Sequence, residues 1–385
     1  MKNIERYFDC CSGCLACVQI CPKNAIIIEN NAIGFGYPKI DSKLCVECGL
    51  CDKVCQCNHE SVKNDIQAVF CAKNRDEQMR EKSQSGGLFS AIAKVILDSG
   101  GVCYGAALSD DLSVIQYRID NEKDLYKLQG SKYVQSFAGQ SFADTAEDLK
   151  NNRLVLYSGT SCIVDGLIRY LNAKKIDTDK LYTADIICHG VLSPVMYKEN
   201  LQRIEKKYGS KVEHVNFRDK SHTGWHGQVE TYMLSDGRKV HDTAWAGLMQ
   251  SCLAKRNCCH VCNYSLIESK QADITMADFW GMNEILDFMR EDEKGYSLAI
   301  IHTRKGKELF DKANLETEQV NLEKYNMKRI LKYNRLGIWP TPKQYYNFAK
   351  DYDRYGYFYA LKKYTEYGGI RFKIKRKVMK LFNRW

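Results

Sequence analysis

The chain has 385 residues, of which 44% are hydrophobic and 27% are charged, and its formal net charge is +10. This length holds two or three domains, and the hydrophobic content excludes a globally disordered chain. No apolar stretch approaches the roughly 18–20 residues that span a bilayer, and the first six residues form no apolar signal core, so we expect a soluble, cytoplasmic protein. The basic charge comes with no nucleic-acid-binding motif, so we expect no nucleic-acid partner.

Two cysteine runs near the N-terminus share the spacing Cys-x2-Cys-x2-Cys-x3-Cys. This spacing is typical of two-cluster bacterial ferredoxins, in which three thiolates bind one cubane and the fourth reaches the other. The first predicted 4Fe-4S cluster is therefore held by Cys11, Cys14, Cys17 and Cys55. The second is held by Cys45, Cys48, Cys51 and Cys21.

Other uses of these cysteines fit the sequence less well. A disulfide framework requires an oxidising compartment, which nothing in the sequence indicates, and zinc sites more often use two separated Cys-x2-Cys pairs. Cys10 and Cys57 lie outside the ligand spacing, so we interpret them as non-ligands. Residues 1–62 are thus predicted to form a ferredoxin module, with short strands at 25–28 and 36–41.

A strand at 66–72 and a helix at 88–97 follow the module. Ser85, Gly86 and Gly87 directly precede this helix. Bare backbone N–H groups at a helix start, next to glycines, favour a phosphate or diphosphate. The alternative is an ordinary helix start capped by Ser85.

Strands and helices then alternate with short links. Strands are predicted at 102–108, 113–119, 153–157 and 181–188, and helices at 142–150, 163–172 and 196–208. This order predicts an α/β sheet with parallel pairs, whose ligand crevice lies at the carboxyl ends of the strands. A polar loop that contains Ser131, Lys132 and Tyr133 interrupts the series.

A further set of four cysteines follows the predicted strands. Cys162 and Cys188 each lie in a loop after a strand, and Cys259-x2-Cys262 comes later. The set predicts a third 4Fe-4S cluster, with a structural zinc, for which Cys258 or His260 are alternative ligands, or inert buried thiols as the other interpretations.

Aromatic and charged residues gather in three later loops, 216–220, 224–226 and 278–281. Such loops suit a pocket for a planar ring, although Phe279 and Trp280 equally suit a cap on the core. Residues 336–385 are predicted to form a helical, basic tail. Apolar and basic residues alternate from Arg371 to Trp385, which makes this segment a candidate for peripheral contact with the inner face of a membrane.

The order of these motifs resembles the coenzyme F-420 hydrogenase/dehydrogenase beta-subunit family, in its bacterial branch with an N-terminal two-cluster ferredoxin. The resemblance extends to about residue 300. It is carried by the two cysteine runs and by 34–38, 85–87, 130–133, 159–162, 188–190, 217–220, 259–262 and 278–281. Ser161 and Ile163 depart from the family's usual proline and glutamine.

The resemblance implies an α+β ferredoxin-like two-cluster module followed by an α/β mixed-sheet flavoprotein domain over residues 66–335. It implies bound FAD, with Ser85, Gly86, Gly87, Ser131, Lys132 and Tyr133 as binding residues, and a further 4Fe-4S cluster near the flavin. No Gly-x-Gly-x-x-Gly fingerprint occurs, so a flavin binds by other contacts. Bacterial relatives often belong to surface-polysaccharide gene clusters.

These features predict an iron–sulfur flavoprotein oxidoreductase. Electrons pass between a redox partner protein, such as a ferredoxin-like donor or a reductase subunit, and an unknown small-molecule substrate. The alternatives are an electron-transfer subunit without its own substrate and a redox-sensing interaction protein. The sequence identifies no catalytic acid or base.

Overall fold

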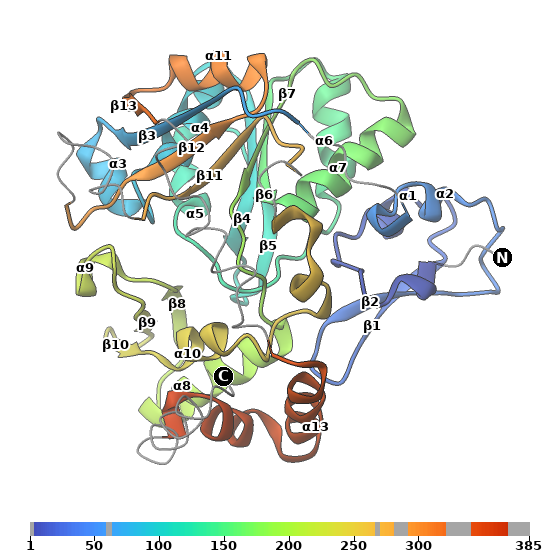
Figure 1. The fold of residues 1–385 in the computed structure, drawn as a ribbon, viewed down its shortest axis with the longest axis vertical. Coiled ribbons are helices and arrows are strands. Elements are labelled where there is room, and N and C mark those ends of the chain that lie inside the picture. The colour runs from blue at the N-terminus through green and yellow to red at the C-terminus, as the bar shows by residue number, and fades with distance from the viewer. Residues whose placement is uncertain (1–3, 59–63, 266–269, 281–291, 321–339, 369–385) are drawn as a thin grey trace.

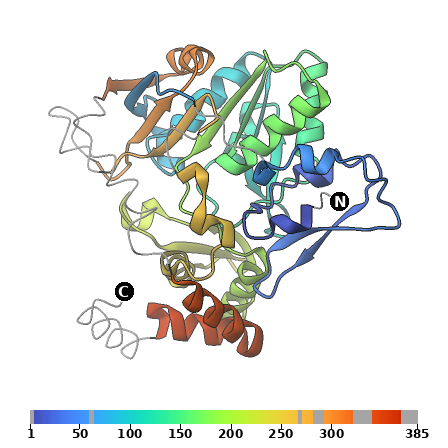
Figure 2. The ribbon, with the colours of Figure 1, turned by 45° about the vertical axis from the view of Figure 1, so that its right-hand side comes forward.

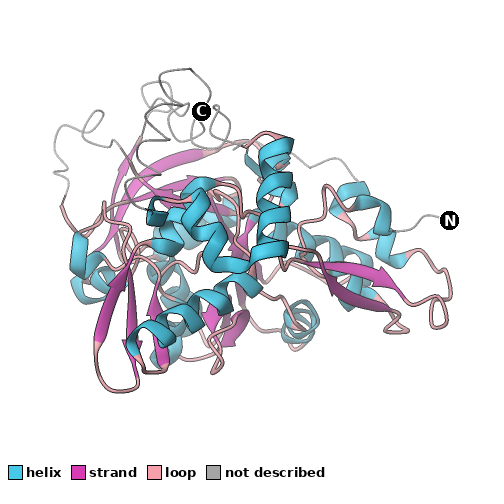
Figure 3. Ribbon diagram, turned by 90° about the horizontal axis from the view of Figure 1, so that it is seen from below, coloured by secondary structure: helices cyan, strands magenta, loops and turns pink. Residues whose placement is uncertain are grey.

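The computed structural model describes residues 4–58, 64–265, 270–280, 292–320 and 340–368. A small N-terminal module lies beside the main body (Figure 1). Its helical elements are η1 (Ile4–Tyr7), α1 (Ala16–Ile20), α2 (Leu50–Lys53) and η2 (Gln56–Asn58). Strands β1 (Ile26–Asn30) and β2 (Gly36–Ile40) pair in antiparallel fashion and project from the body as a hairpin (Figure 3).

An eight-stranded mixed sheet forms the centre of the main body, in the order β13-β3-β12-β11-β7-β6-β4-β5. Its strands are β3 (Ala68–Asn74), β4 (Val102–Leu108), β5 (Val114–Ile119), β6 (Val155–Thr160), β7 (Leu181–Ile186), β11 (Ile274–Asp278), β12 (Ser297–Ile301) and β13 (Leu315–Gln319). The four central strands β4, β6, β7 and β11 are parallel, as the alternation of strands and helices predicts, whereas the outer pairs are antiparallel.

Helices cover both faces of this sheet. The helical elements in this part of the structure are α3 (Glu77–Lys82), α4 (Leu88–Asp98), η3 (Glu122–Asp124), α5 (Leu125–Leu128), α6 (Ser141–Lys150), α7 (Ser161–Lys174) and α11 (Arg304–Lys312). Along β6, Leu156 packs into the cluster with α4 and α11, while Val155 and Tyr157 pack into the cluster with α6 and α7. Because neighbouring strand residues point to opposite faces, the two helix pairs lie on opposite sides of the sheet.

A second, three-stranded antiparallel sheet lies below the first in Figure 1. It consists of β8 (Val212–Asn216), β9 (Glu230–Leu234) and β10 (Lys239–Asp242). The helical elements in this part of the chain are α8 (Pro194–Tyr208), α9 (Lys220–Thr223), α10 (Ala244–Ser251), η4 (Asn257–Val261), η5 (Asn263–Ser265), α13 (Pro342–Tyr364) and η8 (Glu366–Gly368). Figure 2 shows α13 packed under this sheet.

The module and the C-terminal helix share a hydrophobic cluster with the small sheet. Phe35 and Tyr37 of the module belong to the same buried cluster as Trp245 of α10 and Phe348 of α13. On its other side the module contributes Ile20 to the cluster under α6 and α7. The module is therefore held by apolar burial on two sides.

The divisions at residues 1–62, 66–335 and 336–385 stay predictions. The basic stretch from Arg371 to Trp385 lies outside the described residues. In the part of the chain that is described, no helix is both long and apolar enough to cross a bilayer.

Candidate functional site

The structure brings the first predicted ligand set together inside the module. Burial, with a smaller effect of the nearby thiols of Cys11 and Cys55, raises the pKa of the Cys14 thiol to about 12. Cys17 is buried beside the same three cysteines, which likewise raise its pKa. Thiols this close and this buried resist ionisation unless a cationic group lies among them.

The second predicted set lies at the outer edge of the module. Cys51 lies near Cys21 and Cys48, and burial together with these neighbouring thiols raises its pKa. Cys48 is exposed, whereas Cys14 and Cys17 are not. Cys45 lies three residues before Cys48, in the same loop before α2. The second set is therefore nearer to solvent than the first.

A third group of four thiols lies between the large sheet and the segment before β11. It consists of Cys162, Cys188, Cys259 and Cys262. Cys162 interacts with Cys188 and Cys259, and Cys262 interacts with Cys162 and Cys259, while burial raises the pKa of Cys162, Cys188 and Cys262 to about 12. A contact with Cys258 lowers the pKa of Cys259 to about 7. The four cysteines of the third predicted site thus converge from distant parts of the chain.

The position of Cys162 differs from the sequence-based expectation. It lies in the first turn of α7, not in a loop, because the helix begins at Ser161 directly after β6. Cys188 does lie in the loop after β7, and Cys259 lies in η4. Within the described ranges, no three Cys, His, Asp or Glu side chains are arranged to hold a metal ion.

The three groups lie in series. Cys17 of the first group interacts with Cys51 of the second, and Cys14 of the first group interacts with Cys162 of the third. The contact between the first and third groups is close, because a Cβ at Gly166 would lie 3.0 Å from both the Cβ and the Sγ of Cys14. Gly166 follows Cys162 by four residues, so both lie on the same face of α7.

A cavity of about 320 Å³ adjoins the third group and lies at the carboxyl ends of the parallel strands. Its wall includes Ser85, Gly87, Ser131, Lys132, Tyr133, Cys162 and Cys188. Five of the six residues predicted to bind a flavin therefore face the same space as two of the predicted third-cluster ligands. This position agrees with the crevice expected for an α/β sheet.

Gly86 has a different role from its neighbours. It does not line the cavity. A Cβ at this position would lie 2.4 Å from the carbonyl oxygen of Ala72 and 2.6 Å from the amide nitrogen of Ser297, so only glycine lets this segment cross β3 and β12. Ser85 does not cap α4, because Gly87 is the N-cap and Ser85 donates to the carbonyl of Tyr296. The alternative of a Ser85 cap is wrong.

Lys132 holds the polar loop at the cavity wall. Its Nζ donates to the carbonyl oxygens of Lys127 (3.0 Å) and Gln129 (2.7 Å). Burial lowers the pKa of Lys132 to about 7. The lysine thus fixes the backbone of residues 127–132 and places a readily deprotonated amine in the wall.

The aromatic and charged loops meet at another part of the cavity. Asp278 accepts hydrogen bonds from Arg218 Nη1 (2.7 Å) and Trp225 Nε1 (3.1 Å), and the rings of Trp225 and Trp280 stack with centroids 4.5 Å apart. Asp278 and Trp280 line the cavity. Each of the three loops that the sequence singles out therefore contributes a residue to the hydrogen bonds around Asp278.

Arg256 is a site residue that the sequence analysis misses. It is buried, and its guanidinium donates to Cys11 O (2.6 Å), Gln135 Oε1 (2.9 Å) and Gly36 O (2.9 Å), and more weakly to Cys11 Sγ (3.5 Å). Gln135 lines the cavity. One arginine thus connects the first cysteine group, the hairpin of the module and the cavity wall. The only feature of the sequence that could have indicated a role for Arg256 is its position shortly before Cys259-x2-Cys262.

A second buried cation lies behind the third group. Lys270 Nζ donates to Ser161 Oγ (2.5 Å) and Ile186 O (3.0 Å) and lies 3.5 Å from Asp185 Oδ2. Its charge lowers the pKa of Cys188 and Cys262 against the larger effect of burial. Ser161, where the family's usual proline is missing, is therefore a hydrogen-bond partner of this lysine.

Two family models match the chain in succession. The N-terminal domain of the coenzyme F420 hydrogenase/dehydrogenase beta subunit matches residues 69–143, and its C-terminal domain matches residues 152–328. The chain belongs to this family. The matched residues begin after the N-terminal module, and they include the third cysteine group and the wall of the cavity apart from Ser12.

Curated relatives of this beta-subunit family member are distant in sequence. The coenzyme F420-dependent sulfite reductase of Methanocaldococcus jannaschii is 23% identical over 94% of this chain and 53% of its own length. The chain thus spans about half of that relative. One of the F(420)H(2) dehydrogenase subunits of Methanosarcina mazei is 22% identical over 80% of this chain and 84% of its own length.

Among solved structures, the family member is similar to a chain of the F420-reducing [NiFe] hydrogenase complex from Methanosarcina barkeri. The two share 19% sequence identity, with a TM-score of 0.49. The match covers 71% of this chain and 91% of that chain.

Proposed function

We propose that this protein is an iron–sulfur flavoprotein oxidoreductase that carries electrons between a soluble redox protein and a substrate bound in the cavity. The observation that carries the proposal is the series of three cysteine groups that ends at the cavity wall. The named relatives support an oxidoreductase or electron-transfer role, since they are a sulfite reductase and a dehydrogenase subunit.

The residues fit the proposed metal groups. Each set offers four thiols, and burial together with neighbouring thiols raises the pKa of Cys14 in the first set and of Cys162 in the third. A 4Fe-4S core spreads its four ligands over four irons, and its positive charge offsets the cost of ionising buried thiols. Cys48, which is exposed, makes the second set the natural point of contact for an electron donor.

The cavity fits the ring system of a flavin. Its volume lies at the lower end of the range for small-molecule sites, and apolar residues such as Leu88 and Met276 share its wall with polar ones. A bound flavin would convert single-electron transfer to hydride chemistry. The chain holds the loop at Lys132, orients Asp278 through Arg218, and excludes water from the thiols with buried side chains.

A non-catalytic electron-transfer subunit is the second candidate. One relative, which matches over most of its own length, is named as a subunit of a dehydrogenase. In that role the exposed edge at Cys48 would contact one partner and the cavity would face another. A reductive step in the formation of a surface polysaccharide is the setting that the resemblance implies for the first candidate.

Anaerobic purification with iron, zinc and flavin assays tests the proposal. We expect about twelve irons and one flavin per chain, with broad absorption near 400 nm that dithionite bleaches. About eight irons without flavin would favour the electron-transfer subunit, and a colourless protein from iron-replete, oxygen-free cells would refute both candidates.

A further inference from the structure

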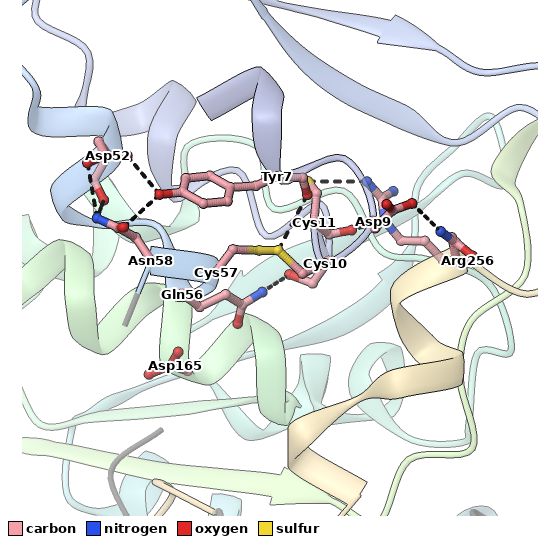
Figure 4. Close-up of a disulfide and its surroundings, with 12 residues drawn as sticks. Tyr7, Asp9, Cys10, Cys11, Asp52, Gln56, Cys57, Asn58, Asp165 and Arg256 are labelled. Atoms are coloured by element: carbon pink, nitrogen blue, oxygen red, sulfur yellow. Dashed lines mark hydrogen bonds between the residues drawn. A yellow bond between two sulfur atoms is a disulfide. The ribbon is translucent and has the colours of Figure 1, made fainter. Parts of the chain in front are cut away.

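The structure contains a disulfide beside the first cysteine group. Cys10 and Cys57 form it, with Cα atoms 5.9 Å apart, although the sequence gives no reason to pair them (Figure 4). Cys10 precedes Cys11 directly, and Cys57 follows Cys55 by two residues. Each cysteine of the disulfide therefore lies within two residues of a predicted ligand of the same cluster.

The two sulfurs have different surroundings. Cys10 is exposed, whereas Cys57 is half-buried. The backbone N–H of Cys57 donates a hydrogen bond to the thiol of Cys55. One sulfur is thus open to a partner from solvent, and the other belongs to a residue that already contacts the cluster-binding set.

Nearby polar groups fix this geometry. Cys10 lies within hydrogen-bond distance of the carbonyl oxygen of Tyr7 (3.5 Å), and the Tyr7 hydroxyl donates to Asn58 Oδ1 (2.6 Å) and to Asp52 Oδ1 (3.2 Å). Asn58 directly follows Cys57. The residues on either side of the disulfide are therefore held to each other by contacts that do not depend on the S–S bond, and they would stay close after its reduction.

We propose that Cys10 and Cys57 form a redox-active pair that takes electrons from the first 4Fe-4S cluster and reduces a substrate disulfide at the surface. The inference rests on the proposed function for the cluster itself and adds a second outlet for its electrons. In reducing compartments, disulfides are usually transient and catalytic or redox-sensing, which is consistent with an exposed pair at this position.

The first half-reaction opens the pair. The Cys10–Cys57 disulfide would take up two electrons from the soluble donor, which a cluster bound at the first cysteine group would relay singly, and two protons from water, giving two thiols. The backbone of Cys57 is hydrogen-bonded to the thiol of Cys55, which is a predicted cluster ligand. The path from that ligand to the S–S bond is therefore short.

The second half-reaction uses the exposed sulfur. The Cys10 thiolate attacks one sulfur of the substrate disulfide, so that a mixed disulfide forms and one substrate thiolate leaves. The Cys57 thiolate then attacks Cys10 Sγ, which restores the Cys10–Cys57 bond and releases the second substrate thiol. In sum, one substrate disulfide gains two electrons and two protons.

A purely structural bond between the two ends of the module is the competing interpretation. Such a bond would stabilise the fold by restricting the unfolded chain, and its state would not follow that of the cluster. The two interpretations therefore differ in whether the thiols of Cys10 and Cys57 appear when the cluster is reduced.

Thiol trapping in the complete, cluster-loaded protein makes this distinction. The protein is reduced anaerobically with methyl viologen radical, bleaching is followed at 400 nm, and samples are quenched with N-ethylmaleimide for peptide mass spectrometry. We expect Cys10 and Cys57 to become alkylated after the cluster absorption bleaches. Bleaching without alkylation would overturn the inference, and a failure to bleach would instead refute the proposed function.

Variants give a second readout. Wild type is expected to take up about two more electrons in a reductive titration than Cys10→Ser, which retains its clusters and their bleaching. The probes for exchange are cystine and insulin, which distinguish a small-molecule disulfide from a protein one. With the matching probe, Cys57→Ser should accumulate a mixed disulfide on Cys10. Equal electron uptake by wild type and Cys10→Ser, or no reaction with either probe, would contradict the proposal.

Discussion

Replacing Arg256 tests how the module is joined to the cavity. Arg256→Met removes the donors for three acceptors, the carbonyl oxygens of Cys11 and Gly36 and the amide oxygen of Gln135. An unsatisfied buried acceptor costs about 1–3 kcal/mol, and since these three acceptors are only partly buried the lower value applies to each, which predicts a loss of about 3 kcal/mol in the free energy of unfolding. The guanidinium also lies over the Tyr37 ring, 4.2 Å from its centroid, which adds to the loss.

The same substitution should change the reduction potential of the cluster that we propose at the first cysteine group. Arg256 brings a buried positive charge and a weak hydrogen bond, 3.5 Å long, to Cys11 Sγ. Both favour the more negative, reduced state, so the potential should fall when they are removed. A differential interaction of about 1–2 kcal/mol corresponds to a decrease of about 40–90 mV for a one-electron couple.

The assays are thermal unfolding under anaerobic conditions and potentiometric titration followed by electron paramagnetic resonance. Arg256→Lys keeps the charge but cannot reach three separated acceptors, so it should recover most of the potential and little of the stability. Arg118→Met is the control, because Arg118 pairs with Asp148 beyond the module. If Arg256→Met melted like wild type and kept the wild-type potential, the assigned role of Arg256 would be refuted.

Three further predictions concern the cavity and the core. Cys188→Ser should lower the iron content by about four atoms per chain while Cys252→Ser, at a buried cysteine outside the three groups, leaves it unchanged, as an iron assay would show. Lys132→Met should lower the flavin-to-protein ratio because the loop loses two hydrogen bonds, whereas Lys127→Met, in the preceding helix α5 and outside the cavity wall, should retain it. Burial raises the pKa of Glu230 to about 8, so the folded state keeps a proton that the unfolded chain loses above about pH 4.3. Stability should therefore fall as the pH rises from about 4.3 to 8, and Glu230→Gln should flatten that decline in urea titrations across this range; an unchanged slope would contradict it.

Local patterns in the sequence predict much of the main sheet. The alternation of apolar runs and amphipathic segments predicts the parallel strands β4, β6 and β7, and the bounds of α6 and α8 differ from the expected ranges by only one or two residues. Strand β13 is missed because Leu315–Gln319 is mostly polar, and an edge strand that pairs on one side with β3 needs only one apolar face. Helix α10 (Ala244–Ser251) is not among the predicted helices either.

The candidate site is predicted only as far as spacing allows. The cysteines of each run in the module are close in sequence, so their spacing alone predicts that Cys11, Cys14 and Cys17 belong to one group. By contrast, the contact of Cys14 with Cys162 is a tertiary contact that no local pattern encodes. The roles of Arg256 and Lys270 depend on acceptors from distant segments, and single charged residues near cysteines are too common to be informative.

The separation of the first and third cysteine groups is set by one turn of a helix. Cys162 belongs to the third group, and Gly166, one turn later on the same face of α7, leaves the space that Cys14 occupies. Helix α1 packs against α6 and α7, and Gln19 of α1 accepts a hydrogen bond from the backbone N–H of Phe142. Since α7 is rigid over this length, the distance between the groups does not depend on the chain that connects the module to the sheet. Electron transfer at a fixed rate requires such a fixed distance, and here the close contact of α1 with α7 supplies it.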